Sequence, residues 1–81
     1  MTVVELISKE ECHLCDVARE VLLKVQKTAP FELRQTKIRQ GDALYETYSE
    51  RVPVVLVDGE FAFQFKVSEH QLLTKLRSLE A

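Results

Sequence analysis

Two cysteines three positions apart, Cys12 and Cys15, stand between an apolar run and an amphipathic helical pattern. The apolar run ends at Ile7, and the helical pattern begins at Leu14. Thiols at this spacing can meet across one turn of a helix. The first backbone N–H groups of a helix have no partner inside it, and together with the helix dipole they favour a thiolate on Cys12. The motif therefore predicts a reactive dithiol where a strand passes into a helix.

Composition and charge limit the kinds of partner. Of the 81 residues, 46% are apolar and 30% are charged, and the net charge is −2. These values are ordinary for a globular chain of one domain, which we expect to be a monomer over residues 1–81. No nucleic-acid partner is predicted, because no face would be dense in Lys and Arg. No apolar run approaches the roughly 20 residues of a membrane span, so no membrane partner is predicted either.

The N-terminus and the number of cysteines indicate the cellular compartment in which the protein is expected. Residues 1–5 lack a basic region and already include Glu5, which is unlike a secretory signal peptide. Two cysteines that close so short a loop would constrain the unfolded chain little, so redox or metal chemistry explains them better than a structural disulfide does. We therefore expect a reducing, cytoplasmic location.

A metal centre is the less favoured use of the cysteines. Adjacent residues on a helix point in different directions, so Cys12, His13 and Cys15 do not converge readily on one zinc ion. A fourth ligand would have to come from His70, which is far along the chain. We therefore expect no metal site.

Residue periodicity divides the chain into elements. Strands are predicted over residues 2–8, 31–38, 53–57 and 61–66, and helices over residues 14–28, 42–48 and 68–79. The first strand is rich in β-branched residues and is typical of a central strand buried on both faces. The first strand, helix and second strand predict a parallel pair with a right-handed crossover. A four-stranded mixed sheet with helices on both faces would bury all the helical stripes.

The Asp58-Gly59 pair predicts a two-residue hairpin turn, because Gly tolerates a positive φ there. Beyond the turn, Phe61, Phe63 and Phe65 alternate with other residues and are predicted to share one half-buried face.

Two polar residues are predicted to cap helices. Asp42 would be the N-cap of the short second helix. Ser68, with Gln71 three residues later, predicts a capping box at the last helix. The apolar side of the short helix would consist of Leu44, Tyr45 and Tyr48.

This order of elements, with Cys-x-x-Cys at the first strand-to-helix turn and Val-Pro before the third strand, resembles the thioredoxin fold. Within that fold the chain is similar to the glutaredoxin-like families. The matching segments are residues 7–15, Leu44, Tyr48, residues 51–55 and residues 58–59. The resemblance implies an α/β fold of order β-α-β-α-β-β-α, with a four-stranded mixed sheet flanked by helices in one glutaredoxin-like domain.

The resemblance also implies that the Val52–Pro53 peptide bond is cis and lies beside the cysteines. The residues alone leave open a trans Pro53 that simply begins a strand.

The candidate site residues have distinct expected roles. Cys12 would be the exposed nucleophile that attacks a substrate disulfide, and Cys15, one turn further on, would resolve the mixed disulfide. The backbone of Val52, next to Pro53, would pair with an extended substrate backbone. His13, if protonated, would support the Cys12 thiolate.

Charges around Cys12 act in both directions. Lys9 and the helix terminus favour its thiolate, whereas Glu10, Glu11 and Asp16 oppose it. We therefore expect the pKa of Cys12 to lie below its free value of about 8.5, although not at the extreme low end.

Some of the matching residues favour the binding of glutathione, and some of the differing residues oppose it. Lys9 matches a family lysine that contacts a glutathione carboxylate, although an ordinary surface lysine is an equal alternative. His13-Leu14 stands where dithiol members have Pro-Tyr, and residues 65–69 replace a Gly-Gly followed by acidic residues that helps to hold glutathione. Glutathione is thus a candidate reductant, with no cofactor bound.

Together these features predict a thiol–disulfide oxidoreductase that acts in electron transport and cell redox homeostasis. Its substrate would be a disulfide-containing protein or a glutathione mixed disulfide. Its electron donor would be glutathione or a flavoprotein reductase. The alternative is a non-catalytic thioredoxin-like module that binds proteins and keeps the cysteine pair as a passive feature.

Overall fold

The computed structural model describes residues 1–80, and its elements follow the predicted order. They are β1 (Val3–Lys9), α1 (His13–Thr28), β2 (Glu32–Ile38), α2 (Tyr45–Tyr48), β3 (Val54–Val57), β4 (Glu60–Gln64) and α3 (Glu69–Glu80). The strands form one mixed sheet in the order β2-β1-β3-β4. β1 and β2 are parallel, whereas the β1–β3 and β3–β4 pairs are antiparallel. The prediction of an α/β fold with a four-stranded mixed sheet is confirmed.

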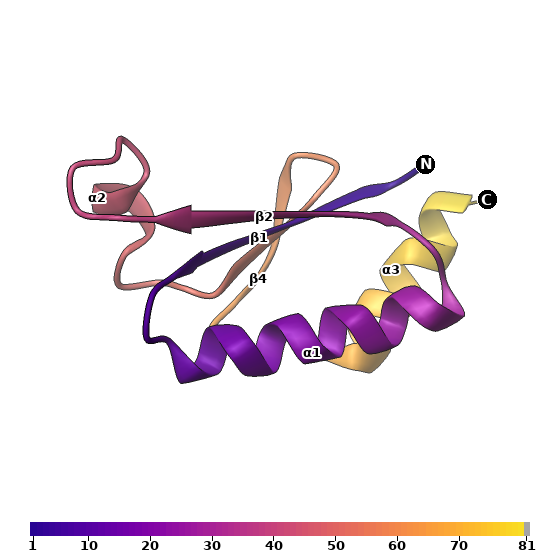
Figure 1. Cartoon of the computed structure of the whole chain (residues 1–81). Coiled ribbons are helices and arrows are strands. Elements are labelled where there is room, and N and C mark those ends of the chain that lie inside the picture. The colour runs from indigo at the N-terminus through magenta and orange to yellow at the C-terminus, as the bar shows by residue number, and fades with distance from the viewer. Residues whose placement is uncertain (81) are drawn as a thin grey trace.

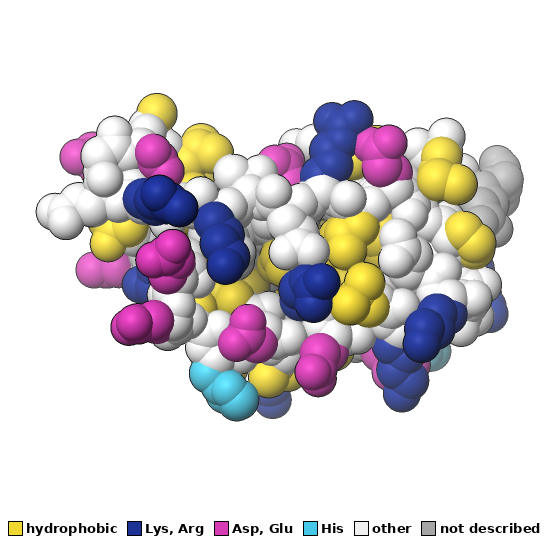
Figure 2. All heavy atoms as spheres, in the orientation of Figure 1, with side chains coloured by type: hydrophobic (Ala, Val, Ile, Leu, Met, Phe, Trp, Pro, Cys, Tyr) yellow, Lys and Arg dark blue, Asp and Glu magenta, His cyan; other side chains and the backbone are white. Residues whose placement is uncertain are grey.

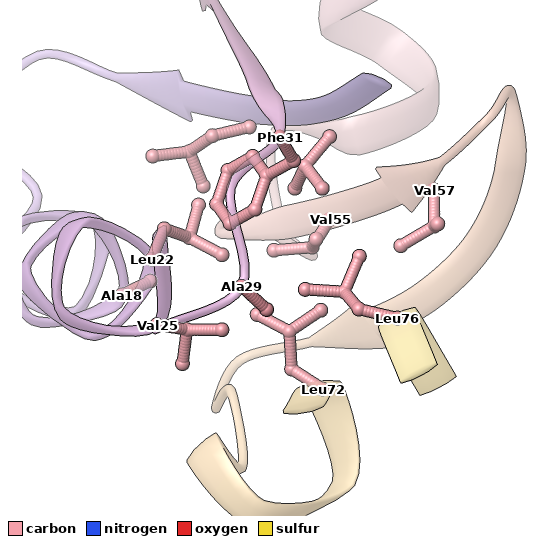
Figure 3. Close-up of a cluster of buried hydrophobic side chains, with 11 residues drawn as sticks. Ala18, Leu22, Val25, Ala29, Phe31, Val55, Val57, Leu72 and Leu76 are labelled. Atoms are coloured by element: carbon pink, nitrogen blue, oxygen red, sulfur yellow. The ribbon is translucent and has the colours of Figure 1, made fainter. Parts of the chain in front are cut away.

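Helices α1 and α3 cover one face of the sheet, as Figure 1 shows. The apolar stripe of α1 lies on this face because Ala18, Leu22 and Val25 recur at helical spacing, and all of them are buried. They pack with Leu72 and Leu76 of α3 (Figure 3). The sheet contributes alternate residues of its two central strands, namely Val4, Leu6, Val55 and Val57.

Helix α2 covers part of the other face. The residues of β1 and β3 that point away from α1 include Ile7 and Val54, which form a second cluster with Ile38 at the end of β2. Tyr45 and Tyr48 of α2 pack against this cluster. Helices therefore lie on both faces, as predicted, and α2 stands at the end of the sheet where α1 begins (Figure 1).

The short helix differs from the prediction at its start. It begins at Tyr45, and its N-cap is Leu44, which makes no side-chain capping bond. The predicted cap Asp42 instead accepts the Arg39 N–H through Oδ2 at 2.7 Å and closes a turn in which Gly41 has a φ of 101°. Leu44 is exposed, so the predicted apolar side of this helix is reduced to its two tyrosines.

The prediction that the three phenylalanines share a face is wrong. Phe63 pairs with Val55, but Phe61 pairs with Leu56 because the register shifts between them. Residues that pair across two strands point to the same side of the sheet, whereas the consecutive residues Val55 and Leu56 of β3 point to opposite sides. The irregularity in the pairing therefore places Phe61 and Phe63 on opposite sides of the sheet. Phe65 lies beyond the end of β4.

The predicted hairpin turn is confirmed, and of the predicted capping box the structure shows the bond that Ser68 accepts. Asp58 and Gly59 both have positive φ, as a tight hairpin turn between β3 and β4 requires. Ser68 Oγ accepts the Gln71 N–H at 3.2 Å and caps the start of α3.

The core gives a stability prediction. Leu22→Ala should lower the free energy of unfolding by about 2–5 kcal/mol, because Leu22 is fully buried and its truncation leaves a cavity under α1. Leu79→Ala should cost roughly 1 kcal/mol or less, because Leu79 is 48% exposed. Urea denaturation followed by circular dichroism measures both. Equal losses in the two variants would contradict this description of the core.

Candidate active site

The cysteines lie at the junction between β1 and α1. Cys12 is the N-cap of α1 and has an extended backbone, with φ −112° and ψ 102°. Cys15 is one turn further, at a Cα–Cα distance of 5.2 Å, and the two form a disulfide. The Cys15 N–H donates to Cys12 Sγ at 3.2 Å, so the sulfur occupies the position that a serine or aspartate oxygen takes in an ordinary cap. After reduction this N–H and the helix dipole would stabilise negative charge on Cys12.

The two sulfur-bearing residues differ in exposure. Cys15 is only 4% exposed and belongs to the second core cluster with Ile7 and Val54. Cys12 is partly exposed and lies at the border of the same cluster. A partner therefore reaches Cys12 more easily than Cys15. This is the asymmetry that the predicted roles of nucleophile and resolving thiol require.

The Val52–Pro53 peptide bond is cis, which confirms that expectation. Val52 is buried in the same cluster as Cys15, so the segment before β3 lies against the dithiol. The Val52 N–H donates to the Tyr48 carbonyl at 3.0 Å, and the Pro53 carbonyl accepts the Phe65 N–H at 2.9 Å. The Val52 N–H is thus already engaged, which leaves the Val52 carbonyl as the group that could accept a bond from a substrate backbone.

Lys9 has a contact that sequence analysis did not predict. Its Nζ donates to the Ser49 carbonyl at 2.9 Å, at the C-cap of α2. A hydrogen bond with a charged donor is stronger than one between neutral groups. Lys9 therefore links the end of β1 to α2. It also lines the same pocket as Cys12.

A polar pocket of about 270 Å³ opens beside both cysteines. Its acids Glu11 and Asp16 were expected beside Cys12 from their places in the sequence. Its cations Arg19 and Lys37 were not expected there. Lys37 comes from β2 and reaches the site because it pairs with Ser8 in the parallel register. Charges of both signs intermingle on the face seen in Figure 2. The pocket is lined by Leu6, Ser8, Lys9, Glu11, Cys12, Cys15, Asp16, Arg19, Gln35 and Lys37.

Glu10 and His13 flank the dithiol in the sequence but are not among the residues that line the polar pocket. Glu10 pairs with Arg39 at 3.7 Å, with both side chains mostly exposed, so this pair adds little stability. His13 is the first residue of α1 and is exposed to solvent. Within residues 1–80, no group of three or more His, Cys, Asp or Glu side chains is arranged to hold a metal ion.

Comparison with known proteins identifies the family. A family model described as "Glutaredoxin-like domain (DUF836)" matches residues 3–77. Because this match covers most of the chain, the protein belongs to that glutaredoxin-like family.

Solved structures agree in fold. The chain is similar to protein Ne2328 from Nitrosomonas europaea, with 24% identity over 91% of this chain and 89% of that one, at a TM-score of 0.77. It is also similar to protein XcR50 from X. campestris, with 25% identity, coverage of 93% and 96%, and a TM-score of 0.76. A thioredoxin variant from Halobacterium salinarum NRC-1 shares 20% identity over 95% of this chain and 73% of that one, at a TM-score of 0.69. The fold is therefore thioredoxin-like.

The combination of fold and site defines a class of chemistry. A thioredoxin-like fold with a bonded Cys12–Cys15 pair at the start of α1 fits a thiol–disulfide redox protein. Among residues 1–80, no helix is long and apolar enough to cross a membrane.

The polar pocket yields a prediction about the Cys12 thiolate. In the reduced protein, Asp16→Asn should lower the pKa of Cys12, because it removes a negative charge that lines the same pocket. Glu20→Gln is the matched control, since Glu20 is exposed on α1 one turn further from the cysteines. The pH dependence of iodoacetamide alkylation measures both. A Cys12 pKa that is unchanged or raised in Asp16→Asn would show that this carboxylate does not act on the sulfur.

Proposed function

We propose that the chain is a thiol–disulfide oxidoreductase that reduces disulfides of proteins, or mixed disulfides of glutathione, through Cys12 and Cys15. The observation that carries this proposal is the unequal exposure of a bonded cysteine pair at a helix N-terminus. Cys15 is 4% exposed, whereas Cys12 is partly exposed and its sulfur accepts a backbone N–H. An inert structural disulfide requires neither feature.

In the first step the Cys12 thiolate attacks one sulfur of the substrate disulfide. A Cys12–substrate bond forms, the substrate S–S bond breaks, and the second substrate sulfur leaves as a thiolate that takes up a proton. Cys12 performs this step because it is the accessible sulfur. After reduction, the Cys15 N–H and the start of α1 would stabilise the thiolate that makes this attack.

In the second step Cys15 attacks Cys12 Sγ. Cys15 attacks as a thiolate after losing its proton to solvent, the Cys12–Cys15 disulfide forms, and the bond between Cys12 and the substrate breaks. The substrate sulfur that was bound to Cys12 leaves as a thiolate and takes up a proton. Overall two electrons pass from the dithiol to the substrate, whose two sulfurs each end as a thiol. The structure holds the product of this step, because Cys12 and Cys15 are bonded to each other at a Cα–Cα distance of 5.2 Å, within the usual range for a disulfide.

A donor must return two electrons to the oxidised pair. We assign this role to glutathione or a flavoprotein reductase, with no resident cofactor, and we place the monomeric protein in the reducing cytoplasm. The alternative is a module that binds a partner protein without turnover. Exposed apolar residues beside the dithiol, such as Leu14 and Val17, fit either function.

Cysteine variants test the proposal. Wild type should reduce a protein disulfide such as that of insulin when dithiothreitol regenerates the dithiol. Cys12→Ser should abolish this turnover, because the accessible nucleophile is lost. Cys15→Ser should make the first attack and then accumulate a mixed disulfide on Cys12, which mass spectrometry detects as an adduct.

One result would count against an enzyme, and another would count against the roles assigned to the two cysteines. One is the absence of turnover by reduced wild type with insulin and with a glutathione mixed disulfide, which would favour the binding module. The other is an adduct on Cys15 in Cys12→Ser that forms as readily as the adduct on Cys12, which would contradict the assigned roles.

A further inference from the structure

The polar pocket beside the cysteines holds charges of both signs that do not pair with one another. Its acids are Glu11 and Asp16, and its cations are Lys9, Arg19 and Lys37. In the part of the chain that the structure describes, residues 1–80, none of the ion pairs involves these five residues. Neither the exchange reaction of the cysteines nor the packing of the core requires this arrangement. Charged side chains that line one hollow in this way are available to a charged ligand.

The floor of the pocket is polar as well. Ser8 lines it and is only 5% exposed, whereas Val4 and Leu6, which share its face of β1, are apolar. The hydroxyl of Ser8 can donate one hydrogen bond and accept others. Cys15, which is 4% exposed, also lines the pocket. The pocket therefore leads from solvent to a buried hydroxyl and to the less accessible of the two cysteines.

The charges of the pocket come from two elements that face each other across it. Lys37 of β2 pairs with Ser8, so the two side chains lie on the same face of the sheet. Asp16 and Arg19 are three positions apart on α1 and therefore lie on one side of that helix. Side chains on a helix tilt towards its N-terminus, which directs the long Arg19 side chain back towards the cysteines. One small molecule in this pocket of about 270 Å³ can thus meet a cation and an acid from α1 and a cation from β2.

This arrangement fits a small zwitterion. Nζ of Lys9 already donates to the Ser49 carbonyl, so the cations left for a ligand carboxylate are Arg19 and Lys37. A ligand ammonium group can donate to Asp16. A ligand with only one kind of charge would meet a like charge on the other side of the pocket, whereas a ligand with both kinds is attracted to both.

The sulfurs restrict the ligand further. Cys12 lines the pocket, so a disulfide that reacts with it brings the atoms next to its own sulfur into the pocket. In the disulfide of a free amino acid, such as cystine, the ammonium and carboxylate groups are attached to the second carbon from the sulfur. A cysteine inside a protein has neither group, because both are used in peptide bonds. In glutathione the two groups stand at the far end of the γ-glutamyl residue.

We propose that the polar pocket binds the ammonium and carboxylate groups of a small amino-acid disulfide, which the dithiol then reduces. Arg19, Lys37 and Asp16 are the binding residues. This inference rests on the proposed function, and it adds a substrate class that enters from the β2 side of α1.

The reaction follows the two steps given above. The Cys12 thiolate attacks one sulfur of the amino-acid disulfide, the S–S bond of that disulfide breaks, and one amino-acid thiolate leaves and takes up a proton. Cys15 loses its proton to solvent and attacks Cys12 Sγ, which forms the Cys12–Cys15 disulfide. The second amino-acid thiolate leaves and also takes up a proton. Two electrons pass from the dithiol to the substrate, which ends as two thiols.

Four symmetric disulfides test the proposal near neutral pH. Cystine carries both charges, cystamine carries only ammonium groups, dithiodipropionate carries only carboxylates, and hydroxyethyl disulfide is neutral. The second-order rate constant for oxidation of the reduced protein by each is measured by acid quenching, alkylation of the remaining thiols and mass spectrometry.

Each rate constant of a variant is divided by the wild-type value for the same disulfide, and then by the same ratio for the neutral disulfide. This double ratio removes the intrinsic reactivity of each disulfide and any change in the pKa of Cys12.

Arg19→Gln and Asp16→Asn should each lower the double ratio for cystine about fivefold, because each removes one charge-assisted hydrogen bond at a partly exposed site. Arg19→Gln should also lower the ratio for dithiodipropionate, and Asp16→Asn should lower that for cystamine. Cystine is the decisive substrate because it has no net charge. A change in the long-range field of the protein would act on the two charged disulfides and leave cystine unaffected.

Lys27→Gln and Glu20→Gln are the matched controls. Each removes a charge of the same sign from α1, but neither residue lines the pocket. Both should leave the double ratio for cystine near one. All four substituted residues are exposed to solvent, so the fold should persist.

Glutathione disulfide distinguishes the two sources of the zwitterion. Its double ratio should stay near one in Arg19→Gln and Asp16→Asn. A loss as large as that for cystine would show that the pocket holds the γ-glutamyl group, and the assignment to free amino-acid disulfides would be wrong.

The remaining failures are also distinguishable. The inference is wrong, although the oxidoreductase stands, if wild type reduces insulin and the cystine ratio stays near one in both pocket variants or falls equally in the controls. The same holds if wild type reduces insulin but none of the small disulfides oxidises it. If wild type reacts with neither insulin nor any small disulfide, the proposed function fails and this inference fails with it.

Discussion

The burial of the α1 stripe against the sheet is the contact on which the site depends. Ala18, Leu22 and Val25 hold the helix on the face formed by alternate residues of β1 and β3. Because a helix is rigid over a few turns, fixing its middle also fixes its first residue, and β1 delivers the chain to that point. The sulfur of Cys12 therefore stands at the end of the sheet with backbone N–H groups behind it, and Cys15 is turned into the core.

The first turns of α1 separate two unlike environments. On the β2 side lies the polar pocket, which both cysteines line and where Lys37 and Arg19 oppose Glu11 and Asp16. On the β4 side lies an apolar groove between α1 and the segment before α3, and neither cysteine is among its lining residues. The charges of the polar pocket are therefore the ones that surround the sulfurs.

Local sequence signals predicted most of the elements and failed where a distant contact decided. The Asp58-Gly59 turn and the Ser68 cap need only their neighbours, and both hold. Asp42 made a bond within its own turn, which competes with capping. The alternation of Phe61 and Phe63 is a period-two pattern, but an irregularity in the β3–β4 ladder breaks it, and pairing across strands is not encoded by spacing along one strand.

The sequence by itself determined the dithiol, the β-α-β-α-β-β-α order and the likeness to glutaredoxins, because these depend on residue types at short range. Only the tertiary structure decided what surrounds the sulfurs. Lys37 reaches them through the parallel register of β1 and β2, and Lys9 binds the end of α2. Phe65 is held beside the Val52–Pro53 segment because its N–H donates to the Pro53 carbonyl. Each of these contacts joins residues more than ten positions apart, and such contacts form only when the strands have come together in the folded chain.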